Sequence, residues 1–506
     1  MKQKYVGLGI ISLLLFIFVP ASTGTHHETT VVGTGDPAID VPAVQDAVDK
    51  FNTVYLQGEF DFGTNYVHVS KPDVTLTAQN LGDASITGVL WNQNLDGPPG
   101  RNNPYEGLIT VMPDDFTNPT SIPTGFKMTN LKFYCQNLQR RSTAISLYNI
   151  EDPTNLTIIR NNAFLDISNN ALGVHPAWVN GEIYIQHNEF SGAGGGSRSL
   201  FTFPMGTGTP DELLEISDNI FGGMGWAITI QVHHMVVDVH HNVVAGHEVL
   251  GATIGILSNN WLVQPQGNPP YPRDPDSEPP TTIRNNAISD CLIPIWLGSS
   301  GEASVNHLVT ENTISGSCGF GIALYAYGLN NKIIDNDLSM GSFAWEQILI
   351  EGPGHTVANN TFGASSGSWP AVAIYATNDY HAYPDSVPHD TYGVVLMEND
   401  YRNTGLPGWE YGIGCIQIGL NWNPDGITPR KVRDCLIKEE GRFPEGSGGA
   451  RKHIMNLVPP VGVSENNRIV GYPAYNVFDP GIGQRMKEAR EELIEQLQAL
   501  AEEIKK

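Results

Sequence analysis

The chain has 506 residues and a formal net charge of −25, from 28 basic and 53 acidic residues. A surface of this sign disfavours nucleic acid as a partner, and it repels a polyanion such as pectate or alginate unless a cation or a local basic patch intervenes. Charged residues make up only 16% of the chain, which excludes a disordered polyelectrolyte.

Residues 1–24 have the pattern of a secretory signal peptide. Lys2 and Lys4 precede the apolar run VGLGIISLLLFIFV, and the small-residue segment PASTG follows it. That run is too short and wrongly flanked for a stable membrane span, and no later stretch reaches the about 18 apolar residues that a transmembrane helix needs. We therefore expect a secreted or cell-surface protein, cleaved after Ala21 or Gly24, with no membrane segment after signal removal.

A short amphipathic helix is predicted at about residues 42–51. The sequence DVPAVQDAVDKF, from Asp40 to Phe51, places apolar residues at helical spacing. Asp40 would precede the helix and Pro42 would stand just inside its first turn, which are favoured positions for these residue types.

A short sequence motif then repeats along the chain. The unit N-x-(Phe/Ile/Leu/Val/Tyr), first clear in IIRNNAF at residues 158–164, recurs at intervals from 23 residues (Asn219 to Asn242) to 44 residues (Asn242 to Asn286). A minimum in the low twenties with occasional extensions is typical of a solenoid. Stacked coils lie about 4.8 Å apart, so we expect an inward ladder of these side chains, with a structural role. The predicted ladder residues are Asn162, Asn188, Asn219, Asn242, Asn286, Asn312, Asn336, Asn360, Asn399, Asp434 and Asn467.

A second sequence feature follows the repeated Asn by about ten residues. It is a small residue before an alternating apolar pair, which predicts a strand with one buried face. One coil therefore holds at least two strands and a sharp Asn-bearing turn. The segments are AITIQ (227–231), ATIGI (252–256), PIWLG (294–298), GIALY (321–325), QILIE (347–351), AVAIY (371–375) and CIQIG (415–419).

This pattern resembles the right-handed parallel β-helix family, which includes pectate lyases, polygalacturonases, alginate epimerases and lyases, phage tailspikes and many surface proteins. The resemblance covers about residues 30–480 and implies an all-β solenoid whose first coil is closed by the N-terminal cap helix. The predicted division is a signal peptide at 1–24, a β-helix domain at 25–480 and a C-terminal charged, amphipathic helix at 481–506. One fold hosts many activities, so the resemblance implies little about function.

The C-terminal segment differs in character from the repeats. Leu493, Leu497, Leu500 and Ile504 form a narrow apolar stripe among Glu and Lys residues. A helix with such a stripe either docks on the end of the solenoid or pairs with a copy of itself, so self-association through this helix is an alternative to docking.

Cysteine spacing leaves two alternatives open. Cys291 and Cys318 stand four residues before Ile295 and Ile322, which predicts equal sites on adjacent coils. A disulfide and a stacked pair of free thiols both suit that placement. The total of five cysteines leaves at least one thiol unpaired.

The predicted binding surface is the outward side of the alternating strands. The insertions at 258–281, 376–392 and 420–430 follow these strands and would wall the sheet. Glu351 would lie one rung from both Tyr325 and Tyr375, a combination of aromatic faces and a polar centre that suits a sugar ring. The predicted substrate-binding residues are Gln231, Trp296, Tyr325 and Tyr375, joined by Trp345 and Trp369, which precede their strands as Trp226 and Trp409 do.

Catalysis has weaker support in the sequence. Hydrolysis needs two carboxylates within about 5 to 10 Å, and the candidates are Glu351 and Asp379, with His381 beside the second. The alternative is a solvated strand Glu and an ordinary loop Asp. A lyase or epimerase needs a base and a cation, yet the outward column contains no Arg or Lys. The polygalacturonase and alginate-epimerase motifs are missing; the nearest string to D-P-H is Gly173-Val174-His175-Pro176.

Metal binding has no clear signature. QVHHMVVDVHHNVVAGH holds five histidines around Asp238, and we expect the pairs His233-His234 and His240-His241 to face different sides. Calcium bound by loop carboxylates such as Asp385 and Asp390 is left open as an alternative, although these residues have no ligand-loop pattern. The hypothesis is a polysaccharide-recognising extracellular β-helix, with hydrolase or lyase activity left open; the alternative is a non-catalytic structural or adhesive surface solenoid.

Overall fold

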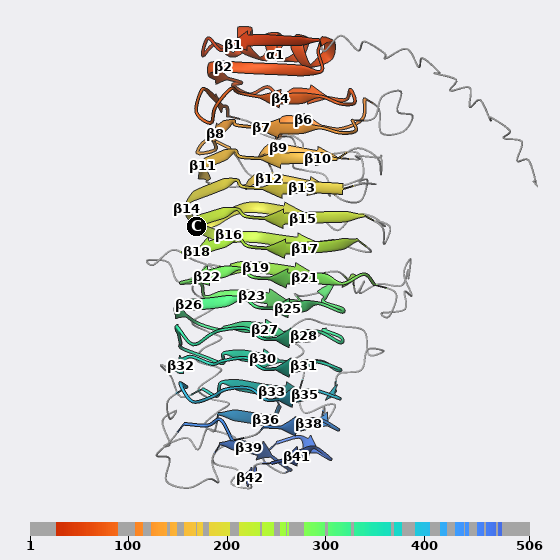
Figure 1. The fold of residues 1–506 in the computed structure, drawn as a ribbon, viewed down its shortest axis with the longest axis vertical. Helices are drawn as coiled ribbons and strands as arrows, with labels where there is room; N and C mark the ends of the chain where they lie inside the picture. The colour runs from red at the N-terminus through yellow and green to blue at the C-terminus, as the bar shows by residue number, and fades with distance from the viewer. Residues whose placement is uncertain are drawn as a thin grey trace, which may run out of the picture.

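Figure 1 shows the fold in a computed structural model of the chain. The residues that the structure describes are 27–89, 107–114, 123–138, 142–148, 156–167, 170–175, 182–202, 212–232, 235–246, 254–259, 261–262, 278–298, 302–324, 328–365, 369–376, 390–404, 415–421, 431–439, 441–444, 453–459, 462–471 and 474–477.

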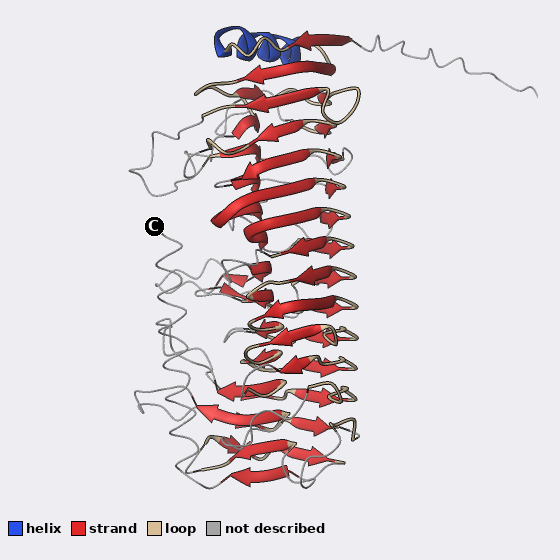
Figure 2. Ribbon diagram, turned by 90° about the vertical axis from the view of Figure 1, so that its left-hand side faces the viewer, coloured by secondary structure: helices blue, strands red, loops and turns tan. Residues whose placement is uncertain are grey.

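The chain winds into a long stack of coils in which each strand pairs with strands one coil before and after it (Figures 1 and 2). Among the described strands the pairings are parallel, apart from one short antiparallel pair between β20 (Trp261–Leu262) and β24 (Glu302–Ala303). The stack confirms the predicted all-β solenoid and fits a right-handed parallel β-helix, the hand that parallel crossover connections adopt almost without exception.

Most coils contribute strands to three faces. The first face comprises β1 (Glu28–Val32), the start of β2 (Thr53–Asp61), β4 (Thr75–Thr77), β7 (Lys127–Thr129), β10 (Thr157–Arg160), β13 (Glu182–Gln186), β15 (Leu213–Ser217), β17 (Val236–His240), β21 (Thr281–Arg284), β25 (Leu308–Thr310), β28 (Lys332–Ile334), β31 (Thr356–Ala358), β35 (Val395–Met397), β38 (Leu436–Lys438) and β41 (Arg468–Val470).

The second face follows the Asn turn and contains β5 (Ala84–Thr87), β8 (Lys132–Tyr134), β11 (Ala163–Ile167), the starts of β14 (Glu189–Thr202) and β16 (Ile220–Gln231), β18 (Val243–Ala245), β22 (Ala287–Ser289), β26 (Thr313–Cys318), β29 (Gly341–Phe343) and β32 (Ala364–Ser365).

The third face carries the predicted alternating strands. It comprises β3 (Val67–Val69), β6 (Gly107–Val111), β9 (Thr143–Tyr148), β12 (Asn170–His175), the ends of β14 and β16, β19 (Ile254–Asn259), β23 (Ile293–Leu297), β27 (Ile322–Leu324), β30 (Ile348–Ile350), β33 (Val372–Ala376), β36 (Ile416–Asn421), β39 (Ile454–Leu457) and β42 (Ala474–Val477), while β34 (Thr391–Tyr392), β37 (Val432–Arg433) and β40 (Ser464–Glu465) form a small corner sheet.

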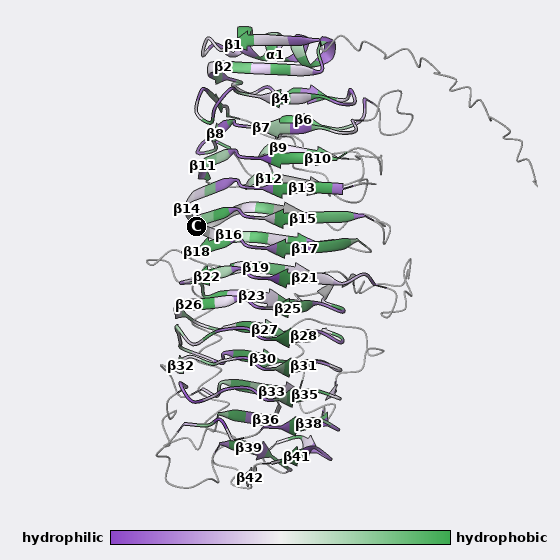
Figure 3. Cartoon of the chain, in the orientation of Figure 1, coloured by the Kyte–Doolittle hydropathy of each residue, from purple (hydrophilic) through white to green (hydrophobic). Residues whose placement is uncertain are grey.

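The core runs along the axis of the coil. Inward residues repeat at the same register position, as in Ile159, Ile185 and Ile216, and all three are fully buried. Figure 3 shows apolar residues recurring in strand after strand along the stack. Rings also stack from coil to coil: Phe164 and Phe190 lie 4.8 Å apart between centroids, and Phe190 and Phe221 lie 4.7 Å apart. Each rung therefore covers the apolar surface of the next.

The predicted asparagine ladder is confirmed from Asn162 to Asn399. In each step an Asn Nδ2 donates to the Oδ1 of the next ladder Asn at 2.9 to 3.0 Å. The same Oδ1 accepts the backbone N–H of the preceding ladder Asn, as in Asn312 to Asn336 at 3.1 Å. The residue before each ladder Asn has positive φ, for example 55° at Asn161, so the left-handed corner turns the amide inward.

Two predicted ladder members are wrong. The rung after Asn399 is Glu439, whose Oε2 accepts the Asn399 backbone N–H at 2.9 Å and whose Oε1 accepts its Nδ2–H at 2.8 Å. Asp434 instead lies at the corner just before the first-face strand β38, with φ 55°. Asn467 accepts the backbone N–H of Cys435 at the same corner. A search for Asn could not find a ladder that ends on a glutamate.

The other corner, just before the first-face strands, has its own buried polar column. The His307 backbone N–H donates to Asn331 Oδ1 at 2.9 Å, and the Asn331 N–H donates to His355 Nδ1 at 3.2 Å. Burial lowers the pKa of both His307 and His355 to about 4. His355 is therefore a neutral imidazole that uses Nδ1 as an acceptor and Nε2 as the donor to Glu351 O at 3.3 Å.

The cap helix is present and longer than predicted. Helix α1 (Pro37–Lys50) begins at Pro37 instead of Pro42, because Asp36 is the N-cap and accepts from the Ala38 N–H. Asp40 is buried inside the helix, where its carboxylate accepts from Thr34 and Gly35 and from the Asp61 N–H in β2. α1 packs on β2 and β3 at the end of the stack (Figure 2).

The predictions about the cysteines and the C-terminal helix have different outcomes. All five cysteines are buried free thiols, Cys291 and Cys318 included. The predicted helix at 481–506 lies outside the described residues, as does the signal peptide. Among the residues that the structure describes, no helix has the length and apolar character that crossing a membrane requires.

Candidate functional site

Part of the outer side of the third face is apolar. We call it the aromatic face, and it consists of two sets of side chains that pack together outside the coil. The buried set is Ile254, Leu257, Ile293, Phe320, Ala323, Leu349, Ala373, Tyr375, Met455 and Leu457, and the half-buried set is Trp226, Leu292, Trp296 and Trp345.

Strand register explains how this face forms. Leu257, Trp296, Ala323, Leu349 and Ala373 occupy one outward column, one rung apart. Leu349 and Ala373 are as fully buried as the inward residues beside them. The wall of the solenoid therefore carries a second apolar cluster on its outer side in addition to the axial core.

A buried hydrogen-bond network crosses this cluster. The Tyr375 hydroxyl lies 2.9 Å from Glu346 Oε1 and 2.8 Å from Gln417 Oε1. A phenol has one proton, so it donates to one of these oxygens and accepts from the other partner, which Gln417 can supply by presenting its amide nitrogen. The Tyr375 backbone carbonyl accepts from Thr391 Oγ1 at 2.7 Å, which ties the network to the corner sheet.

The predicted acid site is only partly within the described residues. Leu324, Ile350 and Ile374 pair in register, so Glu351 and Tyr375 occupy neighbouring rungs as predicted. Glu351 is 1% exposed and Tyr375 is fully buried. Tyr325, Asp379 and His381 lie outside the described residues, so the pairing of Glu351 with Asp379 stays a prediction.

The predicted tryptophans are better placed for contact with a ligand. Trp296, Trp345 and Trp369 are half-buried, and Trp409 lies outside the described residues. The ring of Trp345 lies 4.9 Å from that of Phe320, and a Cβ on Gly319 would come within 2.7 Å of Trp345, so the indole packs directly on the backbone. Gln231 pairs in register with Asn259 and is half-buried on the same face.

Sequence reasoning missed Glu346 as a member of this face. It precedes the alternating segment QILIE, so period-two alternation gave it no direction. Its neighbour Gln347 turns inward and bonds to Gly363 at both amide atoms, at 2.8 Å each, which fixes the strand entry and sends Glu346 outward. A Trp-Glu pair directly before a strand was the available signal.

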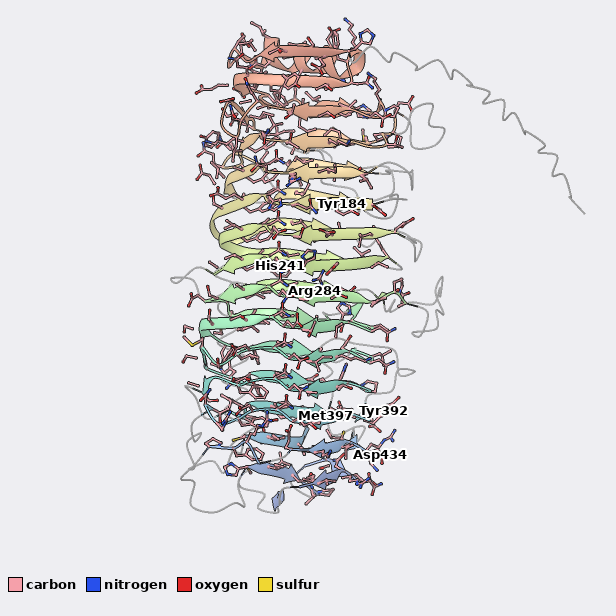
Figure 4. The ribbon with its side chains drawn as sticks, viewed as in Figure 1. Tyr184, His241, Arg284, Tyr392, Met397 and Asp434 are labelled. Atoms are coloured by element: carbon pink, nitrogen blue, oxygen red, sulfur yellow. The ribbon has the colours of Figure 1, made fainter. Side chains whose placement is uncertain are left out.

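The first face carries a separate polar network. Arg284 donates to both oxygens of Asp238, at 3.1 and 2.8 Å, and Glu215 Oε1 accepts from Gln186 and Ser217 at 2.8 Å each. His240 Nε2 lies 3.5 Å from Glu215 Oε1. Figure 4 shows Tyr184, His241 and Arg284 along this face.

The groups of this network already form hydrogen bonds and an ion pair with one another. Burial, followed by the contact with Glu182, raises the pKa of Tyr184 to about 12, so the phenol stays protonated at neutral pH. The contact with Asp238 raises the pKa of Arg284. No group of three or more His, Cys, Asp or Glu side chains suited to a metal ion occurs within the described ranges. We therefore regard this network as a stabilising one.

The predicted calcium ligands have no shared site in the described part of the chain. Asp390 accepts from the Lys431 backbone N–H and from Arg433 Nε, both at 2.9 Å, so its two oxygens are engaged. Asp385, His233, His234 and His247 lie outside the described residues. His240 and His241 contact each other through Nδ1 at 2.8 Å, where one ring must donate to the other.

Comparison with known proteins finds only distant structural similarity. Neither a protein-family model nor a curated protein matches the chain. Among solved structures, the chain is similar to the mannuronan C-5 epimerase AlgE6 A-module of Azotobacter vinelandii, with TM-score 0.43, 10% identity, and 88% and 96% of the two chains covered.

Two other structures show the range of similar proteins. A PL6 alginate lyase in complex with a trisaccharide matches with TM-score 0.38, 12% identity and 89% of each chain covered. The Streptococcus pneumoniae surface protein and adhesin PfbA matches with TM-score 0.29, 12% identity, and 89% and 100% covered. With TM-scores below 0.5, these similarities carry no argument about activity or substrate.

Proposed function

We propose that this protein is an extracellular polysaccharide-recognising β-helix and that its aromatic face contacts the glycan. The observation that supports this proposal is the group of half-buried indoles, Trp226, Trp296 and Trp345, around an apolar sheet surface. A pyranose ring offers an apolar face for stacking and hydroxyl groups for hydrogen bonds, so indoles next to polar groups suit it. Glu346 and Gln417 are buried in the same cluster and bond to the Tyr375 hydroxyl, so they hold the face in place and the indoles make the contact with the sugar.

The test is retention of the purified protein by immobilised neutral and acidic polysaccharides. Trp296→Ala and Trp345→Ala should each weaken retention about two- to tenfold, because stacking on an aromatic ring contributes about 0.5 to 1.5 kcal/mol. Tyr66→Ala is the matched control, since Tyr66 is an exposed aromatic residue (37%) in the first coils. Equal retention of all three variants would overturn the assignment of this face.

Recognition without cleavage is the form of this function that we favour. Glu351, the proposed catalytic acid, is 1% exposed, so a glycosidic bond would need access to a buried carboxyl group. Released reducing or unsaturated ends should be measured in the same assay. Release that disappears in Glu351→Gln would establish a hydrolase or lyase instead.

The second candidate is a non-catalytic structural or adhesive surface solenoid. The full burial of Leu349, Ala373 and Tyr375 supports it, because a face closed in this way stabilises the stack and offers no binding site. This candidate predicts no retention by any polysaccharide. Truncation before residue 481 would then separate self-association through the C-terminal helix from attachment by the β-helix itself.

Export is the remaining part of the proposal. The pattern of residues 1–24, with Lys2 and Lys4 before the apolar run, supports a cleaved secretory signal. N-terminal sequencing of protein recovered outside the cell should begin at Ser22 or Thr25. Recovery of uncleaved chain inside the cell would contradict secretion.

A further inference from the structure

A surface pocket lies at the corner between the first and second faces, away from the aromatic face. Its volume is about 520 Å³, and it is lined by Thr129, Asn130, Arg160, Asn161 and His187. These residues follow or end the successive strands β7, β10 and β13, which lie one above another in Figure 1. The volume falls in the range of small-molecule sites.

The solenoid repeat fixes the direction of the lining side chains. Asn130, Asn161 and His187 all have left-handed backbone conformations, with φ of 63°, 55° and 54°. Equal backbone conformations in neighbouring coils project side chains the same way, one rung apart. Asn161 Nδ2 donates to Asn130 Oδ1 at 2.6 Å, and Asn130 Nδ2 donates to Ala78 O at 3.0 Å, so the amide pair is held in place.

The charge of the pocket is opposite to that of the chain. The five lining residues include no carboxylate, although the chain has 53 acidic residues against 28 basic ones. Arg284, Arg402 and Arg433 each form an ion pair with an aspartate. Arg160 is exposed and, within the described ranges, forms no ion pair. It is thus a local basic centre on an acidic surface.

We propose that this pocket binds the carboxylate of a uronic-acid residue, with Arg160 as the anchor. A guanidinium pairs with a planar carboxylate through two parallel N–H···O bonds, which gives both energy and orientation. The Asn161 amide and the His187 ring can meet the sugar hydroxyls, and the Thr129 oxygen, whose proton goes to Thr77 Oγ1 at 2.7 Å, can accept from one of them. The site is separate from the aromatic face and does not depend on the function proposed for it.

The surroundings limit the ligand to a single acidic sugar. The Arg160 strand pairs with β13, whose neighbour β15 carries Glu215, and the next strand, β17, carries Asp238. A second carboxylate further along the first face would approach these acids and be repelled. One uronate unit at the end or branch of a glycan therefore suits the pocket better than a continuous polyanion.

Saturation-transfer NMR on the full chain at low ionic strength tests this proposal, with sodium glucuronate, glucose and sodium acetate as probes. We expect signals for glucuronate and at least tenfold weaker binding in Arg160→Gln. Arg468→Gln is the charge-matched control, because Arg468 is an exposed first-face arginine in the last coils, and it should bind glucuronate normally.

Each alternative result counts against a defined part of the proposal. Unchanged glucuronate binding in Arg160→Gln would overturn the site, and acetate binding as tight as glucuronate would overturn the saccharide assignment. Glucose binding equal to glucuronate would overturn the role of the carboxylate. Trp296→Ala should leave glucuronate binding intact, so failure of the aromatic-face proposal and failure of this one are distinguishable.

Discussion

At the residue scale, Glu439 shows how a polar ladder can end inside a protein. Each ladder Asn both accepts from one neighbour and donates to the other, so the last rung needs acceptors only. A carboxyl group meets that need: Oε1 accepts from Asn399 Nδ2 and from the Tyr401 hydroxyl, and Oε2 accepts from the Asn399 backbone N–H. Burial outweighs these three hydrogen bonds and raises the pKa of Glu439 to about 7.

Glu439→Gln should change the alkaline side of the stability profile. The folded-state pKa of about 7 lies above the ordinary value of 4.5, so the fold favours the protonated acid. This contribution is complete below pH 4.5 and is lost as the pH rises through 7, a total of about 3 kcal/mol at most. The glutamine variant should lack this decline in chemical denaturation between pH 5 and 8. An equal decline in both proteins would contradict the role of Glu439.

At the element scale, helix α1 depends on one buried side chain. Asp40 lies on the helix, yet its carboxylate accepts from the Thr34 N–H and hydroxyl, the Gly35 N–H and the Asp61 N–H. These contacts join the segment before the helix, the helix and the first coil. The helix packs its own Val44, Ala47 and Val48 onto the end of the apolar core, which would otherwise be exposed.

Asp40→Ala should therefore release the cap. It removes the acceptor of the Thr34 and Asp61 N–H groups, while the Gly35 N–H keeps Glu59 O at 3.1 Å, and each lost hydrogen bond to a charged group costs about 1.5 to 3 kcal/mol. Hydrogen exchange should accelerate in β1, α1 and the start of β2, while β25 to β31 keep wild-type protection. Asp46→Ala, at an exposed position of the same helix, is the control. Uniform acceleration along the stack would show that the cap and the coils do not unfold separately.

Elements with a strict period could be predicted, and elements set by three-dimensional closure could not. The ladder from Asn162 to Asn399 follows from spacing alone. Spacing could not show that the outward column would be buried, because the residues that cover Leu349 and Ala373 do not recur at a fixed interval in the sequence. The end of the ladder at a carboxylate and the start of α1 depend on contacts that occur once and do not repeat along the chain. The same holds for the Arg160 pocket, which joins residues from three coils.

At the scale of the whole molecule, stability is shared between neighbouring coils, so one column of buried groups can set the response of the stack to pH. A solenoid has few contacts between distant repeats, and its stability is close to a sum of repeat and interface contributions. The corner column of His307, Asn331 and His355 spans three successive coils in the middle of the chain. Loss of this column would divide the stack into two shorter ones.

Acid should therefore unfold the molecule from the middle. Burial holds the pKa of His307 and His355 near 4, below the ordinary value of 6.5, so the neutral rings stabilise the fold above pH 6.5 and this contribution is lost as the pH falls toward 4. Protonation of His355 Nδ1 also removes the acceptor for the Asn331 N–H.

The loss amounts to at most about 3 kcal/mol per histidine, opposite in sign to that of Glu439, so maximal stability is expected near pH 6.5. His307→Asn with His355→Asn keeps a side-chain acceptor of the kind that Asn331 supplies in the same column, and it should flatten the acid limb of the denaturation profile between pH 6.5 and 4. His68→Asn, a half-buried residue of the first coils, is the matched control and should keep the wild-type acid limb. An unchanged acid limb in the double variant would mean that other groups set the acid stability of the stack.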